Sequence, residues 1–135
     1  MFGIGYSPYE GVTRSSDFMT YLIKSFMQTD QQNRHVWEQV LFRIHSIVDF
    51  QMKRQSRLNG LMPDFFIRAG ENYIAPKNKV LESSHDGDYY YNSCRTPWRY
   101  AMDTILNNTP VSIQLHTLNK WVRQKARGNP AFIMS

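Results

Sequence analysis

The chain of 135 residues has the length of one ordinary domain, and its 41% apolar and 20% charged residues exclude an intrinsically disordered protein. A single cysteine, Cys94, excludes an intrachain disulfide framework and a cysteine-built zinc site, and no apolar run is long enough to cross a membrane. The net charge of +5 comes from basic residues spread along the chain, so we expect neither a nucleic-acid partner nor a membrane partner. The first residues lack a basic segment followed by an apolar one, so no secretory signal is expected there.

Two amphipathic helices are predicted in the first half of the chain. The first begins at residue 15 or 16 and ends at about residues 28–30, because Phe18, Leu22 and Phe26 recur every four positions after serines that suit an N-cap. The second runs from about residue 31 to 51, where apolar residues follow the clearest helical period in the chain.

Residues 60–95 differ from the rest of the chain. They carry Gly, Pro, Asn, Asp and Ser throughout, with aromatic residues between them, and Pro63 excludes a helix that continues from the preceding segment. The run from Phe65 to Ile67 could form one short strand. A long irregular segment is uncommon in a compact domain and is typically functional, so we expect the site here.

Two further helices are predicted after this loop. Thr96-Pro97 and Thr109-Pro110 each combine a good N-cap with a proline suited to the first helical position. Asn107-Asn108 ends the first of these helices, and Gly128 suits the end of the second. The sequence therefore predicts a single all-α domain over residues 1–135, with about four helices in antiparallel pairs and one long loop at about 60–95.

The densest polar stretch lies at residues 82–99. It contains the carboxylates Glu82, Asp86 and Asp88, one histidine, three consecutive tyrosines and two arginines. Carboxylates beside aromatic residues suit sugar chemistry, because glycoside hydrolysis uses two carboxyl groups that flank the scissile bond. Loops of this kind carry function more often than packing.

Two other readings of the same stretch remain open. Asp86-Gly-Asp88 is similar to a fragment of a calcium loop, although the glutamate of the EF-hand spacing is absent. A turn stabilised by its own aspartate side chains is the simpler alternative. His85 has no second metal-type ligand at a fixed spacing, so we expect no metal and no cofactor.

Four motifs resemble those of glycoside hydrolase family 8. Residues 87–103 closely resemble its signature, and residues 13–19, 60–66 and 118–121 match other motifs in the family's order. The tract from Asn92 to Arg99 is the most specific part. The resemblance identifies the chain as a C-terminal-half fragment of a catalytic domain of this family, and covers about residues 13–130.

The resemblance implies an inverting endo-glycosidase that hydrolyses a β-1,4-linked glucan, xylan or chitosan and is mainly extracellular. It implies an (α/α)6 barrel, of which this chain would form a part. The family's acid glutamate belongs to a region that we do not find, so the isolated chain is expected to be inactive and to self-associate through uncovered helix faces. The alternative is a non-catalytic remnant, or a carbohydrate-binding or helical interaction module.

The resemblance also assigns roles to individual residues. Asn92 stands where some members carry an aspartate base, and an amide cannot act as a base, so the resemblance implies Glu82 as the general base and Asn92 as a residue that positions water or substrate. The expected substrate contacts are Tyr91, Arg95, Asp88 and Asp86, with loop shaping as the alternative for the two aspartates. Structural or secondary roles are expected for Arg99 and Trp98, with Trp98 in the core and sugar stacking as its alternative. For Arg14 and Asp17, a pair that bridges helices and a substrate contact are equally expected.

Overall fold

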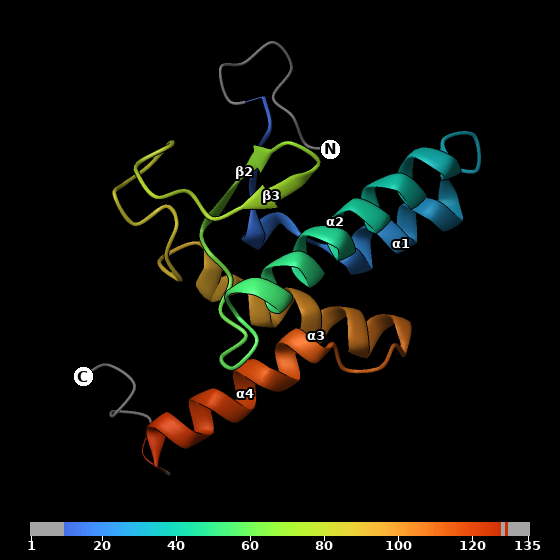
Figure 1. Cartoon of the computed structure of the whole chain (residues 1–135). Coiled ribbons are helices and arrows are strands. Elements are labelled where there is room, and N and C mark those ends of the chain that lie inside the picture. The colour runs from blue at the N-terminus through green and yellow to red at the C-terminus, as the bar shows by residue number, and fades with distance from the viewer. Residues whose placement is uncertain (1–9, 128, 130–135) are drawn as a thin grey trace.

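A computed structural model describes residues 10–127 and 129. The helices and strands follow in the order β1 (Val12–Arg14), the short 3-10 turn η1 (Ser15–Asp17), α1 (Thr20–Thr29), α2 (Arg34–Arg54), β2 (Phe65–Ala69), β3 (Asn72–Ile74), the short 3-10 turn η2 (Ser93–Arg95), α3 (Thr96–Asn107) and α4 (Ile113–Ala126). Helices α1 and α2 form a hairpin that packs against α3. After α3 the chain turns back, and α4 begins below α3 and runs toward the lower left of the view (Figure 1). No helix in the described part of the chain is long and apolar enough to span a membrane.

The structure corrects the all-α prediction and with it the partial (α/α)6 barrel. Three antiparallel strands form a sheet in the order β1-β2-β3, with Thr13 opposite Phe66 and Arg68 opposite Tyr73. The candidate strand at residues 65–67 is therefore real, and it is the central strand. The sequence did not reveal its partners because strands of three residues are too short to show alternation, and β1 pairs with a segment distant in the chain.

The four helices of the described residues lie where the sequence predicted helices, with three differences at their starts. Helix α2 begins at Arg34 and ends at Arg54, about three residues later at each end than the predicted range of about 31–51. Helix α1 begins at Thr20, because Ser15 and Ser16 are fully buried in η1 and Ser15 donates its backbone N–H to Asp64 O (3.2 Å). Helix α4 begins at Ile113, because the N-cap is Ser112, whose Oγ accepts from Leu115 N (3.1 Å).

The core lies between the α1–α2 hairpin, the sheet and α3. Phe18, next to α1, stacks on Phe66 of β2 with ring centroids 6.0 Å apart. An ion pair links α1 to α3, since Lys24 Nζ contacts Asp103 Oδ2 at 2.7 Å. Gly60 has a φ of +68° and lies so close to α4 that a Cβ would meet Leu118 N at 2.7 Å. These contacts make the sheet and the helices one packed unit that supports the loop at residues 76–93. The buried apolar cluster consists of Phe18, Ile23, Ile44, Ile47, Val48, Met52, Met62, Phe66, Tyr73, Tyr100 and Leu115.

Candidate active site

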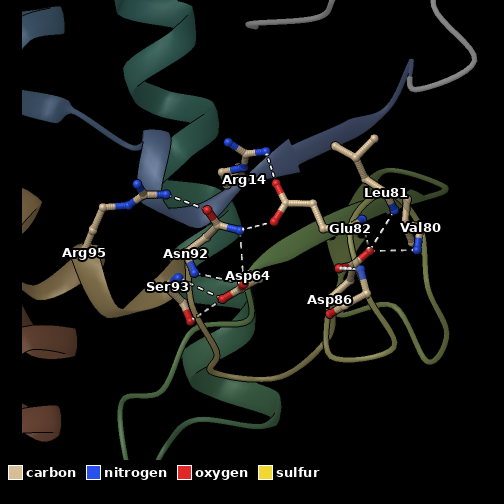
Figure 2. A network of polar contacts seen from close by, with 10 residues as sticks. Arg14, Asp64, Val80, Leu81, Glu82, Asp86, Asn92, Ser93 and Arg95 are labelled. Atoms are coloured by element: carbon tan, nitrogen blue, oxygen red, sulfur yellow. Dashed lines mark hydrogen bonds and ion pairs between the residues drawn. The ribbon is translucent and has the colours of Figure 1, made fainter.

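Glu82 lies at the centre of a polar network beside the sheet (Figure 2). Its Oε1 accepts from Arg14 Nη2 at 2.6 Å, and its Oε2 accepts from Asn92 Nδ2 at 2.7 Å. The Glu82 side chain is nevertheless 42% exposed. Each carboxylate oxygen offers two lone-pair directions, so both oxygens are oriented and still open to a solvent water. This is the geometry that a general base needs.

Asn92 is buried, and both ends of its amide are occupied. Its Nδ2 donates to Glu82 and to Asp64 Oδ2 (3.2 Å), and its Oδ1 accepts from Arg95 Nη2 (2.5 Å). The two carboxylates on one side and the guanidinium on the other determine the orientation of the amide. Asn92 therefore acts on Glu82 and fixes the direction of its carboxylate.

Asp64 was not recognised as a site residue from the sequence. It is 2% exposed, and its Oδ1 accepts from Tyr90 N (3.1 Å), Ser93 N (2.8 Å) and Ser93 Oγ (2.7 Å). Its Oδ2 accepts from Asn92 N at 2.9 Å as well as from the Asn92 amide. The available signal was an aspartate inside the motif at residues 60–66, directly before an apolar strand, where a buried carboxylate needs several donors.

Asp86 is 1% exposed and accepts only from the backbone. Its Oδ2 bonds to the N–H groups of residues 80, 81 and 82 at 2.8, 2.7 and 3.1 Å, and its Oδ1 bonds to Ser83 N at 2.8 Å. Burial raises the pKa of Asp86, but the four backbone donors lower it by more, and its pKa lies below the ordinary value. Of the two predicted roles, the structure places Asp86 as a loop-shaping residue, because a carboxylate this buried is not presented to a substrate.

The other predicted contact residues lie on the solvent side of the loop. The Asp88 side chain is 66% exposed and contacts His85 Nδ1 at 2.9 Å, and the His85 ring stacks on Tyr90. Tyr91 is 75% exposed, with the Arg95 guanidinium 6.0 Å from its ring centroid. These side chains are accessible to a large ligand.

Of the residues expected to have structural roles, Arg99 and Arg14 make contacts between elements, whereas Trp98 is exposed. Arg99 joins α3 to η1, because its Nε donates to Ser16 O (3.1 Å). Arg14 pairs with Glu82 and not with Asp17, which is partly buried in η1. The prediction that Trp98 belongs to the core is wrong. It is 52% exposed, and the Arg99 guanidinium lies over its ring at 4.3 Å from the centroid, a cation–π contact that an exposed tryptophan can make.

The Asp86-Gly-Asp88 turn was the candidate for a calcium loop, and its two carboxylates have hydrogen-bond partners within the chain. Within residues 10–127 and 129, no three His, Cys, Asp or Glu side chains gather as a possible metal site. The Asp86-Gly-Asp88 turn instead directs one carboxylate to backbone donors and the other to His85. This is the turn stabilised by its own aspartates that the sequence left as an alternative.

The chain is similar to known glucan-degrading enzymes. It is 36% identical over 124 residues to a β-glucanase from Niallia circulans, covering 91% of this chain and 30% of that protein. It is 28% identical over 126 residues to an endoglucanase from Bacillus sp. (strain KSM-330), covering 90% of this chain and 26% of that protein. The apo structure of a β-1,3-1,4-glucanase from Paenibacillus sp. X4 matches with a TM-score of 0.82 and 35% identity, over 90% of this chain and 32% of that one.

These comparisons correct the family that the motifs predicted. No family model matches the chain, and the similar proteins are named as β-glucanase and endoglucanase. The assignment to glycoside hydrolase family 8 is therefore replaced by a similarity to glucan-degrading glycosidases. The chain spans about a third or less of the length of these relatives.

Proposed function

We propose that this chain carries part of the active site of a glycosidase that hydrolyses β-glucan, with Glu82 as the general base. The observation that supports this most directly is the Glu82 carboxylate itself, which Arg14 and Asn92 hold on both oxygens while 42% of the side chain stays exposed. The similarity of nearly the whole chain to a β-glucanase and to a β-1,3-1,4-glucanase supports the substrate class.

In the proposed reaction, Glu82 takes a proton from a water molecule on its exposed side. The water oxygen bonds to the anomeric carbon as the glycosidic C–O bond breaks, and a carboxylic acid protonates the departing oxygen. Direct attack by water inverts the anomeric configuration. The described residues include no carboxyl group that we assign as this acid, so we expect the isolated chain to lack hydrolytic activity.

The substrate contacts would come from the exposed rim of the same loop. Tyr91 offers an aromatic ring to the apolar face of a sugar, and Arg95 and Asp88 offer polar groups to its hydroxyls. Arg95 also has a structural role, because its guanidinium donates a hydrogen bond to the side-chain amide of Asn92. The polysaccharide partner is therefore a β-linked glucan chain that crosses this rim.

A second candidate function is a carbohydrate-binding module without catalysis. The exposed Tyr91 ring beside the Arg95 guanidinium favours it, because aromatic rings and polar side chains can hold a sugar without any chemical step. On this view, the chain binds glucan through Tyr91 and Arg95, and Glu82 has no chemical role.

A chimera separates the two functions. Residues 10–127 would replace the matching third of the Paenibacillus sp. X4 β-1,3-1,4-glucanase, and reducing-end release from mixed-linkage β-glucan would be measured. General base catalysis contributes on the order of 10²–10⁴ in rate, so Glu82→Gln should lower kcat by about that factor while glucan binding persists. Glu38→Gln on α2, whose side chain is 49% exposed beside Arg34, is the matched control and should leave activity unchanged. Full activity in Glu82→Gln would exclude the general-base role.

A further inference from the structure

We propose that Asp64 and Asp86 are a pair of positioning residues, in which each buried carboxylate holds one member of the Glu82–Asn92 contact. The functional part of this inference rests on the proposed role of Glu82. The structural part rests on the hydrogen bonds that the two carboxylates accept, and these involve different segments of the loop (Figure 2).

Asp64 organises the turn that carries Asn92. Its carboxylate accepts from three backbone N–H groups, at residues 90, 92 and 93, and from the side chains of Asn92 and Ser93. A carboxylate has about four lone-pair sites, so these five donors leave no capacity for a substrate. Asp64 therefore acts through Asn92, whose amide it directs toward Glu82.

Asp86 organises the backbone that carries Glu82. The four N–H groups of residues 80–83 converge on its two oxygens, and one of them is the N–H of Glu82 itself. The backbone at Glu82 is thus held in the direction from which its side chain reaches Arg14 and Asn92. Like Asp64, Asp86 is almost fully buried and has no capacity left for a ligand.

The two carboxylates share one support at the start of β2. Asp64 N donates to Asp88 O, and Phe65 N donates to Asp86 O, both at 2.8 Å. Asp64 O accepts from Ser15 N, which places the neighbouring Arg14 in the same unit. The segments that carry Arg14, Glu82 and Asn92 are therefore all hydrogen-bonded to residues 64–65. These hydrogen bonds hold the Glu82 and Asn92 side chains at their 2.7 Å separation.

Only a carboxylate satisfies these positions. The groups around Asp64 and Asp86 are all hydrogen-bond donors, and an asparagine would turn its own NH2 group toward some of them. Loss of the charge also weakens the remaining bonds, because charge-assisted hydrogen bonds are roughly twice as strong as neutral ones. An isosteric Asp→Asn change should therefore release the turn without removing any side-chain volume.

The test is NMR spectroscopy of the 135-residue chain, with the Asn92 side-chain amide as the probe. In wild type, we expect trans-hydrogen-bond couplings from the Asp64 carboxyl carbon to the nitrogens of Asn92 and Ser93, and their absence would overturn the proposal without any variant. In Asp64→Asn, both Asn92 amide protons should shift and exchange with solvent at least about tenfold faster. In Asp86→Asn, the backbone N–H of Glu82 should likewise exchange with solvent at least about tenfold faster than in wild type.

Ser93→Ala is the matched control. It removes the 2.7 Å hydrogen bond to Asp64 Oδ1 and the hydroxyl's contacts with the Tyr90 backbone, but it leaves the contacts of the Asn92 amide in place. The Asn92 amide signals should stay unshifted in this variant, and an equal shift in Ser93→Ala and Asp64→Asn would overturn a specific positioning role. No glucan is needed for these measurements, so their failure is distinguishable from a failure of the proposed activity, which the Glu82→Gln chimera reports.

Discussion

The side-chain amide of Asn92 donates to the carboxylate of Glu82 across 2.7 Å, although the residues lie ten positions apart in a loop without regular structure. The same amide faces a second carboxylate, Asp64, at 3.2 Å. Asn92 thus separates two negatively charged groups that would repel each other in direct contact. The hydrogen-bond network therefore requires an amide at position 92, because an aspartate there could not donate to Glu82 and Asp64.

Asn92→Asp should destabilise the chain by about 2–4 kcal/mol at pH 7, because it places a third carboxylate between Glu82 and Asp64. Urea unfolding followed by circular dichroism would measure this loss. Adding Glu82→Gln should recover part of it, since the glutamine amide can donate to the new carboxylate. A double variant no more stable than Asn92→Asp would contradict this explanation.

Asp86 should make the stability of the chain depend on acid pH. Its pKa is lower in the folded chain than in the unfolded chain, so it contributes stability above the ordinary aspartate pKa of about 3.9, and this contribution is lost as the pH falls through the lower folded pKa. Asp86→Asn should cost about 1–3 kcal/mol at pH 7. The difference between wild type and variant should shrink below about pH 4, and a difference that is constant with pH would contradict this linkage.

Gly87 should tolerate no side chain. A Cβ at this position would lie 1.9 Å from Pro76 O, so Gly87→Ala must displace the backbone that carries Asp86 and Asp88. We expect a loss of about 3 kcal/mol in the free energy of unfolding. Gly70→Ala is the control, because a Cβ there meets nothing within 4 Å and the cost is only the positive φ, about 1–2 kcal/mol. Equal losses in both variants would show that the close approach to Pro76 is unimportant.

Arg14→Met should separate activity from stability. The Arg14–Glu82 ion pair is partly exposed, at 29% and 42%, so its loss should change the free energy of unfolding by less than about 1 kcal/mol. The orientation of Glu82 would nevertheless be lost, and in the chimera we expect kcat to fall by at least about tenfold. Arg34→Met, which removes the exposed pair with Glu38, is the control and should leave kcat unchanged. Unchanged kcat in Arg14→Met would remove Arg14 from the site.

The chain should self-associate through apolar side chains that its own fold leaves uncovered. Phe42, Leu58, Ile105 and Ile113 are 69–85% exposed, and large exposed apolar groups favour association. Sedimentation velocity should show a weight-average mass that rises with concentration. The double variant Phe42→Ser/Ile105→Ser should shift this rise to higher concentration. A monodisperse monomer over the whole concentration range would contradict the prediction.

The sequence by itself determined the elements that depend on near neighbours. Helical periodicity located the helices of the described chain, and Thr96-Pro97 marked the start of α3 at its observed residue. The loop that carries Glu82 and Asn92 was also identified, because its composition of turn residues, carboxylates and aromatics differs from that of the helices. These features need no knowledge of which distant segments meet.

Only the tertiary structure decided the sheet and the role of Asp64. Strand β1 is recognisable only through its pairing with β2, since three residues carry no periodic signal of their own. Asp64 is an ordinary aspartate before a strand until the turn at residues 90–93 is brought against it. Strand pairing and the burial of a charge depend on contacts between segments far apart in the chain, and chain closure, not local preference, brings these segments together.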